Sequence, residues 1–172
     1  GEDNSAFGAY SLEKNTTGEK NTAIGMGALL RNTTGNFNSA LGASALSSNT
    51  TGDFNIAIGT DALKNNTTGS QNVTVGYQST YQNTEGIQNT ALGYKALEGN
   101  VSGSNNTAVG YKTLQNSSGD RNTALGTGAG NTTDTGSQNV IIGFDADVSV
   151  SDANNQIVIG YNATGAEITP FN

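Results

Sequence analysis

Residues 21–37 read NTAIGMGALLRNTTGNF, and residues 38–54 read NSALGASALSSNTTGDF. This unit, N-T-A-I-G-x-x-A-L-x-x-N-T-T-G-x-x, occurs ten times, beginning at residues 4, 21, 38, 55, 72, 89, 106, 122, 139 and 156. Every step is seventeen residues except the sixteen between 106 and 122. A short fixed period predicts a solenoid in which each copy stacks on its neighbours. We call the copies coils 1 to 10 and number the positions in each coil as places 1 to 17.

The composition of the unit favours strands and turns over helix. Gly, Asn and Thr recur in it, and all three are unfavourable inside helices. The segments TAIG and xxAL are short apolar runs, and NTTG supplies residues suited to a tight corner. The sequence therefore predicts an all-β, parallel β-solenoid with two short strands per coil, each coil advancing about 4.8 Å. Residues 1–172 form one repeat domain.

Two columns of large apolar residues are expected to form the interior. Place 4 holds Phe7, Ile24, Leu41, Ile58, Val75, Leu92, Val109, Leu125, Ile142 and Ile159. Place 9 holds Leu12, Leu29, Leu46, Leu63, Leu97 and Leu114, with Thr80, Gly130, Asp147 and Thr164 in the other coils. Side chains alternate across a strand, so burial of place 4 predicts an outward row of small residues at place 3, namely Ala6, Ala23, Ala40, Ala57, Ala91, Ala108 and Ala124. Such a row would suit close packing against another copy of the chain.

Composition excludes several classes of function. There is no His or Cys, so a Ser/His/Asp or Cys/His nucleophile is excluded and the common transition-metal ligands are missing. The net charge is −7, and the seven Lys and Arg are scattered singly, which argues against nucleic acid as a partner. No apolar run is long enough for direct membrane insertion. A non-enzymatic protein without a cofactor is expected.

The units NTAIGMGAL, NSALGASAL and NTALGYKAL resemble the head repeats of trimeric autotransporter adhesins. The longer form with NTTG is similar to repeat arrays of phage tail-fibre-like surface proteins. The resemblance covers residues 4 to about 165 and implies a left-handed β-roll, a homotrimer, and a location on an extracellular cell-surface or virion appendage. It also implies a structural or adhesive fibre segment, with a host-surface glycan or protein receptor as a further partner.

Three other features suggest candidate binding surfaces. Place 6 carries an aromatic column of Tyr77, Tyr94, Tyr111, Phe144 and Tyr161, which is either a structural stack or a strip that contacts a glycan. Asp145, Asp147 and Asp152 would supply oxygen ligands for calcium or form a solvated corner. Rows of Thr at NTTG leave ice binding as an alternative.

The two ends of the array raise one further alternative. Open coil edges would allow end-to-end assembly into a filament. The last two coils are atypical, because they lose NTTG and gain acidic residues and Pro170. This predicts a cap, or a junction to another domain, at that end.

Overall fold

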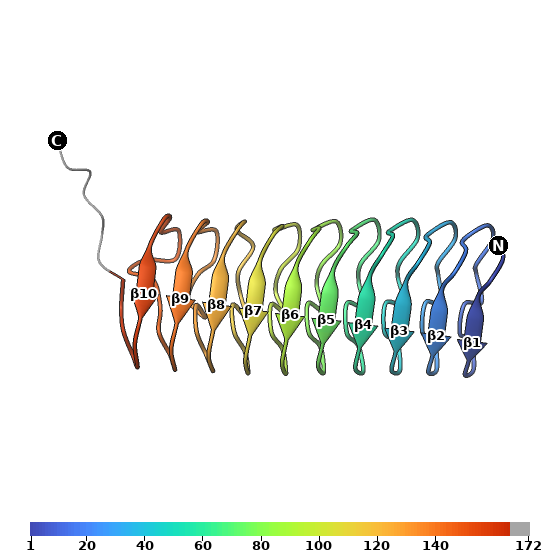
Figure 1. Ribbon diagram of the computed structural model, residues 1–172, viewed down its shortest axis with the longest axis horizontal. Coiled ribbons are helices and arrows are strands. Elements are labelled where there is room, and N and C mark those ends of the chain that lie inside the picture. Colours follow the sequence, from blue (N-terminus) through green and yellow to red (C-terminus); the bar gives the residue numbers. More distant parts are fainter. Residues whose placement is uncertain (166–172) are drawn as a thin grey trace.

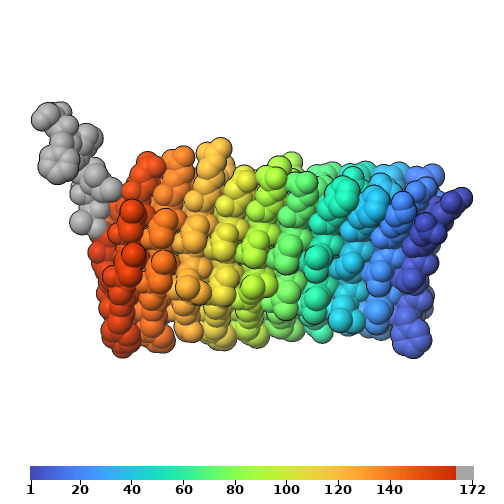
Figure 2. Space-filling model, in the orientation of Figure 1, coloured from blue at the N-terminus to red at the C-terminus, as the bar shows by residue number. Residues whose placement is uncertain are grey.

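The computed structural model describes residues 1–165 and shows a row of short strands along one elongated body (Figure 1). Its ten strands are β1 (Ser5–Phe7), β2 (Thr22–Ile24), β3 (Ser39–Leu41), β4 (Ile56–Ile58), β5 (Val73–Val75), β6 (Thr90–Leu92), β7 (Thr107–Val109), β8 (Thr123–Leu125), β9 (Val140–Ile142) and β10 (Ile157–Ile159). Pro170 lies outside the described residues. The space-filling view shows the coils packed side by side along the whole body (Figure 2).

All ten strands form one parallel sheet in sequence order. Each strand residue pairs with the residue at the same place in the next coil, as in Ala23 with Ala40 and Ile24 with Leu41. The register survives the short step, since Ala108 pairs with Ala124. The predicted parallel β-solenoid is therefore confirmed.

Within residues 1–165 each coil contains only one strand, so the predicted second strand is wrong. The xxAL segment turns instead, because Leu at place 9 has a left-handed backbone, with φ of 50° at both Leu29 and Leu63. Hydrogen bonds between coils continue through this segment, for example from Leu29 N to Ala45 O at 3.0 Å. The coil is thus a strand followed by a series of hydrogen-bonded turns.

The prediction of which residue of each Ala-Ile pair faces inward is also wrong. Ala57 is fully buried, whereas the neighbouring Ile58 is 39% exposed, and the same holds for Ala23 and Ile24. Place 3 therefore lines the interior, and place 4 lies on the outer face of the sheet. The expected burial of leucine at place 9 is confirmed for Leu29, Leu46, Leu63, Leu97 and Leu114.

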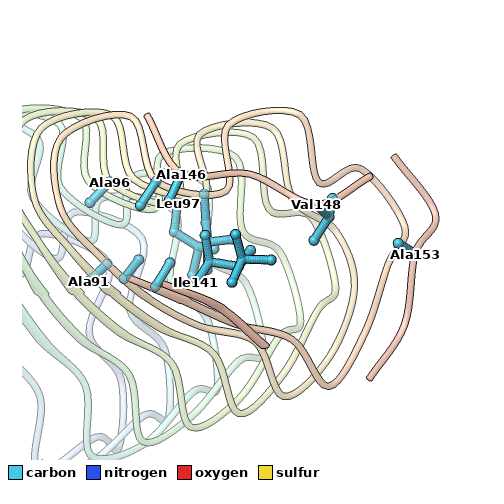
Figure 3. Close-up of a cluster of buried hydrophobic side chains, with 12 residues drawn as sticks. Ala91, Ala96, Leu97, Ile141, Ala146, Val148 and Ala153 are labelled. Carbon is cyan, nitrogen blue, oxygen red and sulfur yellow. The ribbon is translucent and has the colours of Figure 1, made fainter. Parts of the chain in front are cut away.

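Limited interior space explains why alanine faces inward. The buried apolar side chains of coil 4 are Ala57 on the strand and Ala62 with Leu63 on the opposite wall. Only where the leucine is missing does place 3 become large. A Cβ on Gly130 would lie 2.6 Å from Leu114 Cδ2 and 3.0 Å from Ile141 Cδ1, so Ile141 fills the space of the missing leucine (Figure 3). One large side chain at each level is what the interior accommodates.

Two buried columns of asparagine form the rest of the interior. At place 1, Asn55 Nδ2 donates to Gly69 O at 2.9 Å and to Asn38 Oδ1 at 3.1 Å. Asn55 Oδ1 in turn accepts the N–H of Asn72 at 3.0 Å and its Nδ2 at 3.1 Å. At place 12, Asn49 Nδ2 donates to Asn32 Oδ1 at 2.8 Å. These ladders satisfy polar groups that a narrow body must bury.

Glycine at place 5 lets successive coils approach closely. Gly59 has φ of +129°, and a Cβ on it would lie 2.6 Å from Gly76 O. Any other residue would meet both backbone strain and the carbonyl of the next coil. This explains why all ten coils carry Gly at this place.

Coil 5 interrupts the apolar interior. Its inward places hold Thr74, Ser79 and Thr80, all fully buried. The buried apolar residues accordingly fall into two clusters, one from Ala23 to Leu63 and one from Ala91 onward. The hydroxyls of Thr74 and Ser79 donate to backbone carbonyls, but Thr80 Oγ1 has no hydrogen-bond partner.

Replacing Thr80 by leucine is expected to stabilise the protein by about 1–3 kcal/mol. The change removes a buried unsatisfied hydroxyl and restores the leucine stack between Leu63 and Leu97. It also removes a β-branched residue from a backbone with φ of +52°. Chemical unfolding followed by circular dichroism measures the effect, with the exposed Thr68→Leu as the control. Unchanged or lower stability for Thr80→Leu alone would contradict this account of coil 5.

Candidate interaction surface

The outer face of the sheet carries an uncharged apolar strip that runs the length of the body. Its central row is place 4, where seven of the ten large apolar residues are classed as exposed and the other three are half-buried. Place 2 forms a parallel row of Ser5, Thr22, Ser39, Ile56, Val73, Thr90, Thr107, Thr123, Val140 and Ile157. Neither row contains a charged residue. We call these two rows the sheet face.

The sheet face is long because every coil contributes the same places. Ten strands spaced by about 4.8 Å extend over about 43 Å. Apolar patches of this length are rare on monomers and mark surfaces that contact something else. The repeat pattern led us to expect place 4 in the interior, so the sequence alone did not predict this surface.

Aromatic rows flank the sheet face at both ends of the strands. Beyond the strand ends, Tyr77, Tyr94 and Tyr111 stack with ring centroids 5.4 and 5.2 Å apart, and Phe144 stacks on Tyr161 at 5.4 Å. The predicted aromatic column therefore forms two separate stacks. Thr127 occupies the same place in the coil between them. Before the strand starts, Phe37 stacks on Phe54 with ring centroids 4.9 Å apart. The sequence pattern did not predict this pair.

The stacking limits what the tyrosine column can bind. Sugars pack on the faces of aromatic rings, but the interplanar angles of 16° and 9° mean that the tyrosines cover each other's faces. The column therefore presents ring edges and hydroxyls to solvent along most of its length. This geometry favours the structural stack over a sugar-binding platform.

Lysines beside the tyrosines form ion pairs or contact aromatic rings. Lys64 pairs with Asp61 at 2.9 Å and Lys95 with Glu98 at 2.9 Å. The hydrogen bond that Lys64 donates to Asp61 raises the pKa of Lys64 above its ordinary value, and the one that Lys95 donates to Glu98 does the same for Lys95. Lys112 Nζ lies 5.5 Å from the ring centroid of Tyr111. These lysines therefore contact nearby carboxylates and aromatic rings and do not form a basic patch.

The acidic residues near the end do not converge on a metal site. Asp147 Oδ2 accepts the backbone N–H of Thr132 at 2.9 Å, and its Oδ1 accepts that of Val148 at 2.9 Å. Within residues 1–165, no group of three or more His, Cys, Asp or Glu side chains is placed to hold a metal ion. Asp145, Asp147 and Asp152 thus fail as a joint ligand set.

The hydroxyl groups of one threonine row donate hydrogen bonds to backbone carbonyls of the next coil. Thr16 Oγ1 donates to Thr33 O at 2.8 Å, and Thr33 Oγ1 donates to Thr50 O at 2.9 Å. The second row, with Thr34, Thr51 and Thr68, is exposed, whereas Thr33 of the first row is half-buried. The exposed hydroxyls of the NTTG segments therefore lie mainly in this second row.

The fold and surface define a class: a parallel β-solenoid with a continuous apolar face on its sheet. No family model matches the sequence, and no curated protein or solved structure matches the chain. The described part of the chain contains no helix long and apolar enough to cross a membrane.

Proposed function

We propose that this chain is a non-enzymatic structural segment of an extracellular fibre, built from parallel copies that join through the sheet face. The observation that carries the proposal is the sheet face itself, which is uncharged in every coil and carries a large, exposed or half-buried apolar residue at place 4 of every coil. The resemblance of the NTAIG units to adhesin heads supports three copies in a left-handed roll. In such a fibre the rod would present an attachment surface at a distance from its base.

The size of the surface is sufficient for a stable interface. From place 17 before a strand to place 6 after it, the chain spans at most about 20 Å. With a length of about 43 Å, the surface measures on the order of 800 Å², which is the area that each partner contributes to a standard interface. A second copy is the occupant that suits an uncharged repeated surface on a chain with a net charge of −7.

The flanking aromatic rows favour a parallel, in-register arrangement. Rotation about an axis along the body brings the strand starts of one copy beside the strand ends of the next at the same level. Phe37 and Phe54 precede β3 and β4, which are followed by the small Ala43 and Thr60. Tyr77, Tyr94, Tyr111, Phe144 and Tyr161 follow strands that are preceded by Gln71, Gln88, Asn105, Gln138 and Asn155. No strand has an aromatic residue at both ends, so a ring always faces a smaller or polar residue.

Placing lysines on the sheet face is expected to separate the copies. In Leu41→Lys/Ile58→Lys each ammonium would have to be buried without a partner, at about 2–5 kcal/mol per site. Light scattering after size-exclusion chromatography should show a trimer for the unmodified protein and a folded monomer for the variant. The matched control, Thr51→Lys/Thr68→Lys, adds the same charge in the same coils away from the sheet and should remain a trimer.

The absence of cysteine allows a direct test of the arrangement. Arg121→Cys/Thr127→Cys places one thiol at each end of β8, and oxidation should link the copies covalently. Each single variant should stay unlinked. A monomeric unmodified protein, or equal dissociation of both lysine variants, would overturn the proposed assembly and with it the fibre function.

A further inference from the structure

Coil 7 is the short coil, and the structure locates its missing residue. Ser117 N donates to Leu114 O at 3.1 Å, as Asn100 N donates to Leu97 O at 3.2 Å in coil 6. Ser117 therefore stands at place 12, where coils 1 to 6 have Asn. Ser118 follows at place 13 and Gly119 at place 15, so place 14 is the one deleted.

This substitution ends the asparagine ladder of place 12. In coil 6, Asn100 Nδ2 still donates to Asn83 Oδ1 at 2.8 Å. Asn100 Oδ1, however, is buried without a partner, because Ser117 has no amide to offer it. Ser117 Oγ is likewise buried without a partner. Two polar atoms in adjacent coils are thus left unsatisfied, at a cost that native interiors usually avoid.

The backbone ladder at place 13 is broken at the same level. Thr67 N donates to Thr84 O and Thr84 N donates to Val101 O, both at 2.8 Å. The next rung would join Val101 N to Ser118 O, and it is absent among the described residues. The ladder resumes with Ser118 N and Asp134 O. Ser118 O and Val101 N are consequently both left without this backbone partner.

Three oxygen atoms converge at this point. In a regular coil, a Cβ on Gly35 would meet Asn32 Oδ1, Gly52 O and, at 2.8 Å, the donor Asn49 Nδ2. At Gly103 the corresponding neighbours are Asn100 Oδ1, Gly119 O at 2.5 Å and Ser118 O at 2.8 Å. The third neighbour is thus the acceptor Ser118 O, where a regular coil has the donor Nδ2 of the next asparagine.

We propose that a buried water molecule occupies the junction of coils 6 and 7 in place of the missing amide. The water donates one hydrogen to Asn100 Oδ1 and the other to Ser118 O, and it accepts the hydroxyl hydrogen of Ser117. Three hydrogen bonds to otherwise unsatisfied groups are typical of buried structural water. The site follows from one deletion and is independent of how copies of the chain assemble.

The test restores the amide with Ser117→Asn and compares it with Ser102→Asn, an exposed place in the adjacent coil. A high-resolution crystal structure of the unmodified protein should show the water bonded to Asn100 Oδ1, and that of Ser117→Asn should show an amide in its place. The midpoint of thermal unfolding should rise by about 2–4 °C for Ser117→Asn and stay unchanged for the control. A second variant, with Thr inserted between Ser118 and Gly119, restores the seventeen-residue coil and should close the backbone rung as well.

Three results would overturn the proposal. The first is an empty site in the unmodified protein. The second is an unfolding midpoint that neither Ser117→Asn nor the insertion raises. The third is a midpoint that rises with potassium or ammonium concentration at constant ionic strength, which would assign the site to a cation.

Discussion

Asn55→Ala is expected to lower the free energy of unfolding by about 2–5 kcal/mol, the largest effect expected of any single substitution in this protein. The substitution leaves the backbone N–H of Asn72 buried without a partner. It also removes one of two acceptors from the Asn72 amide and one of two donors from Gly69 O, which keeps its bond from Asn66 Nδ2. Each buried group without a partner costs about 1–3 kcal/mol. Urea unfolding followed by circular dichroism measures the loss.

Asn65→Ala is the matched control for this experiment. Asn65 is half-buried in the same region, and its side chain makes no hydrogen bond within residues 1–165. Its loss should change stability by less than about 0.5 kcal/mol. Equal effects of the two substitutions would show that the ladder is not what stabilises the stack of coils.

Ala57→Ile is expected to destabilise the protein by about 2–4 kcal/mol, because place 3 faces an interior that Leu63 already fills. The same enlargement at the exposed Thr51 should be nearly neutral. The structure also provides a compensating change, since Ile141 is accommodated where Gly130 replaces leucine in the preceding coil. Leu46→Gly/Ala57→Ile copies the Gly130 and Ile141 part of that arrangement, but coil 4 keeps Leu63 where coil 9 has Asp147, so only part of the lost stability should be recovered.

The double variant tests the inward direction of place 3 rather than a general sensitivity to bulk. Gly at residue 46 is compatible with the backbone, which has φ of +53° there. If Leu46→Gly worsens Ala57→Ile instead of relieving it, the proposed exchange of volume across the interior is wrong. Thermal unfolding of the four proteins in the cycle gives the coupling directly.

The proposed fibre depends on both features that these variants probe. The asparagine ladders and small alanines make a narrow body in which most buried polar side chains are hydrogen-bonded. Because alanine and asparagine fill the interior, the larger apolar residues of place 4 lie on the outer face, where they are available to other copies. A stiff rod and an apolar assembly face therefore arise from the same repeat.

Period and residue type were enough to predict stacked coils and parallel strands in register. Equivalent places recur at a fixed interval, so each column of identical residues had to lie at strand spacing. The buried leucines of place 9 and the turn-forming NTTG segment followed from the same pattern.

The sequence by itself determined that one member of each Ala-Ile pair faces inward, because side chains alternate across a strand. The tertiary structure alone decided which one. That choice depends on left-handed residues such as Phe37 before the strand and on glycine corners after it, and these set how the strand is rotated into the coil. With alanine facing inward, the larger apolar residues form the sheet face. The packing of neighbouring coils also sets the aromatic stacks at the edges of this face and the break in the asparagine ladder after Asn100.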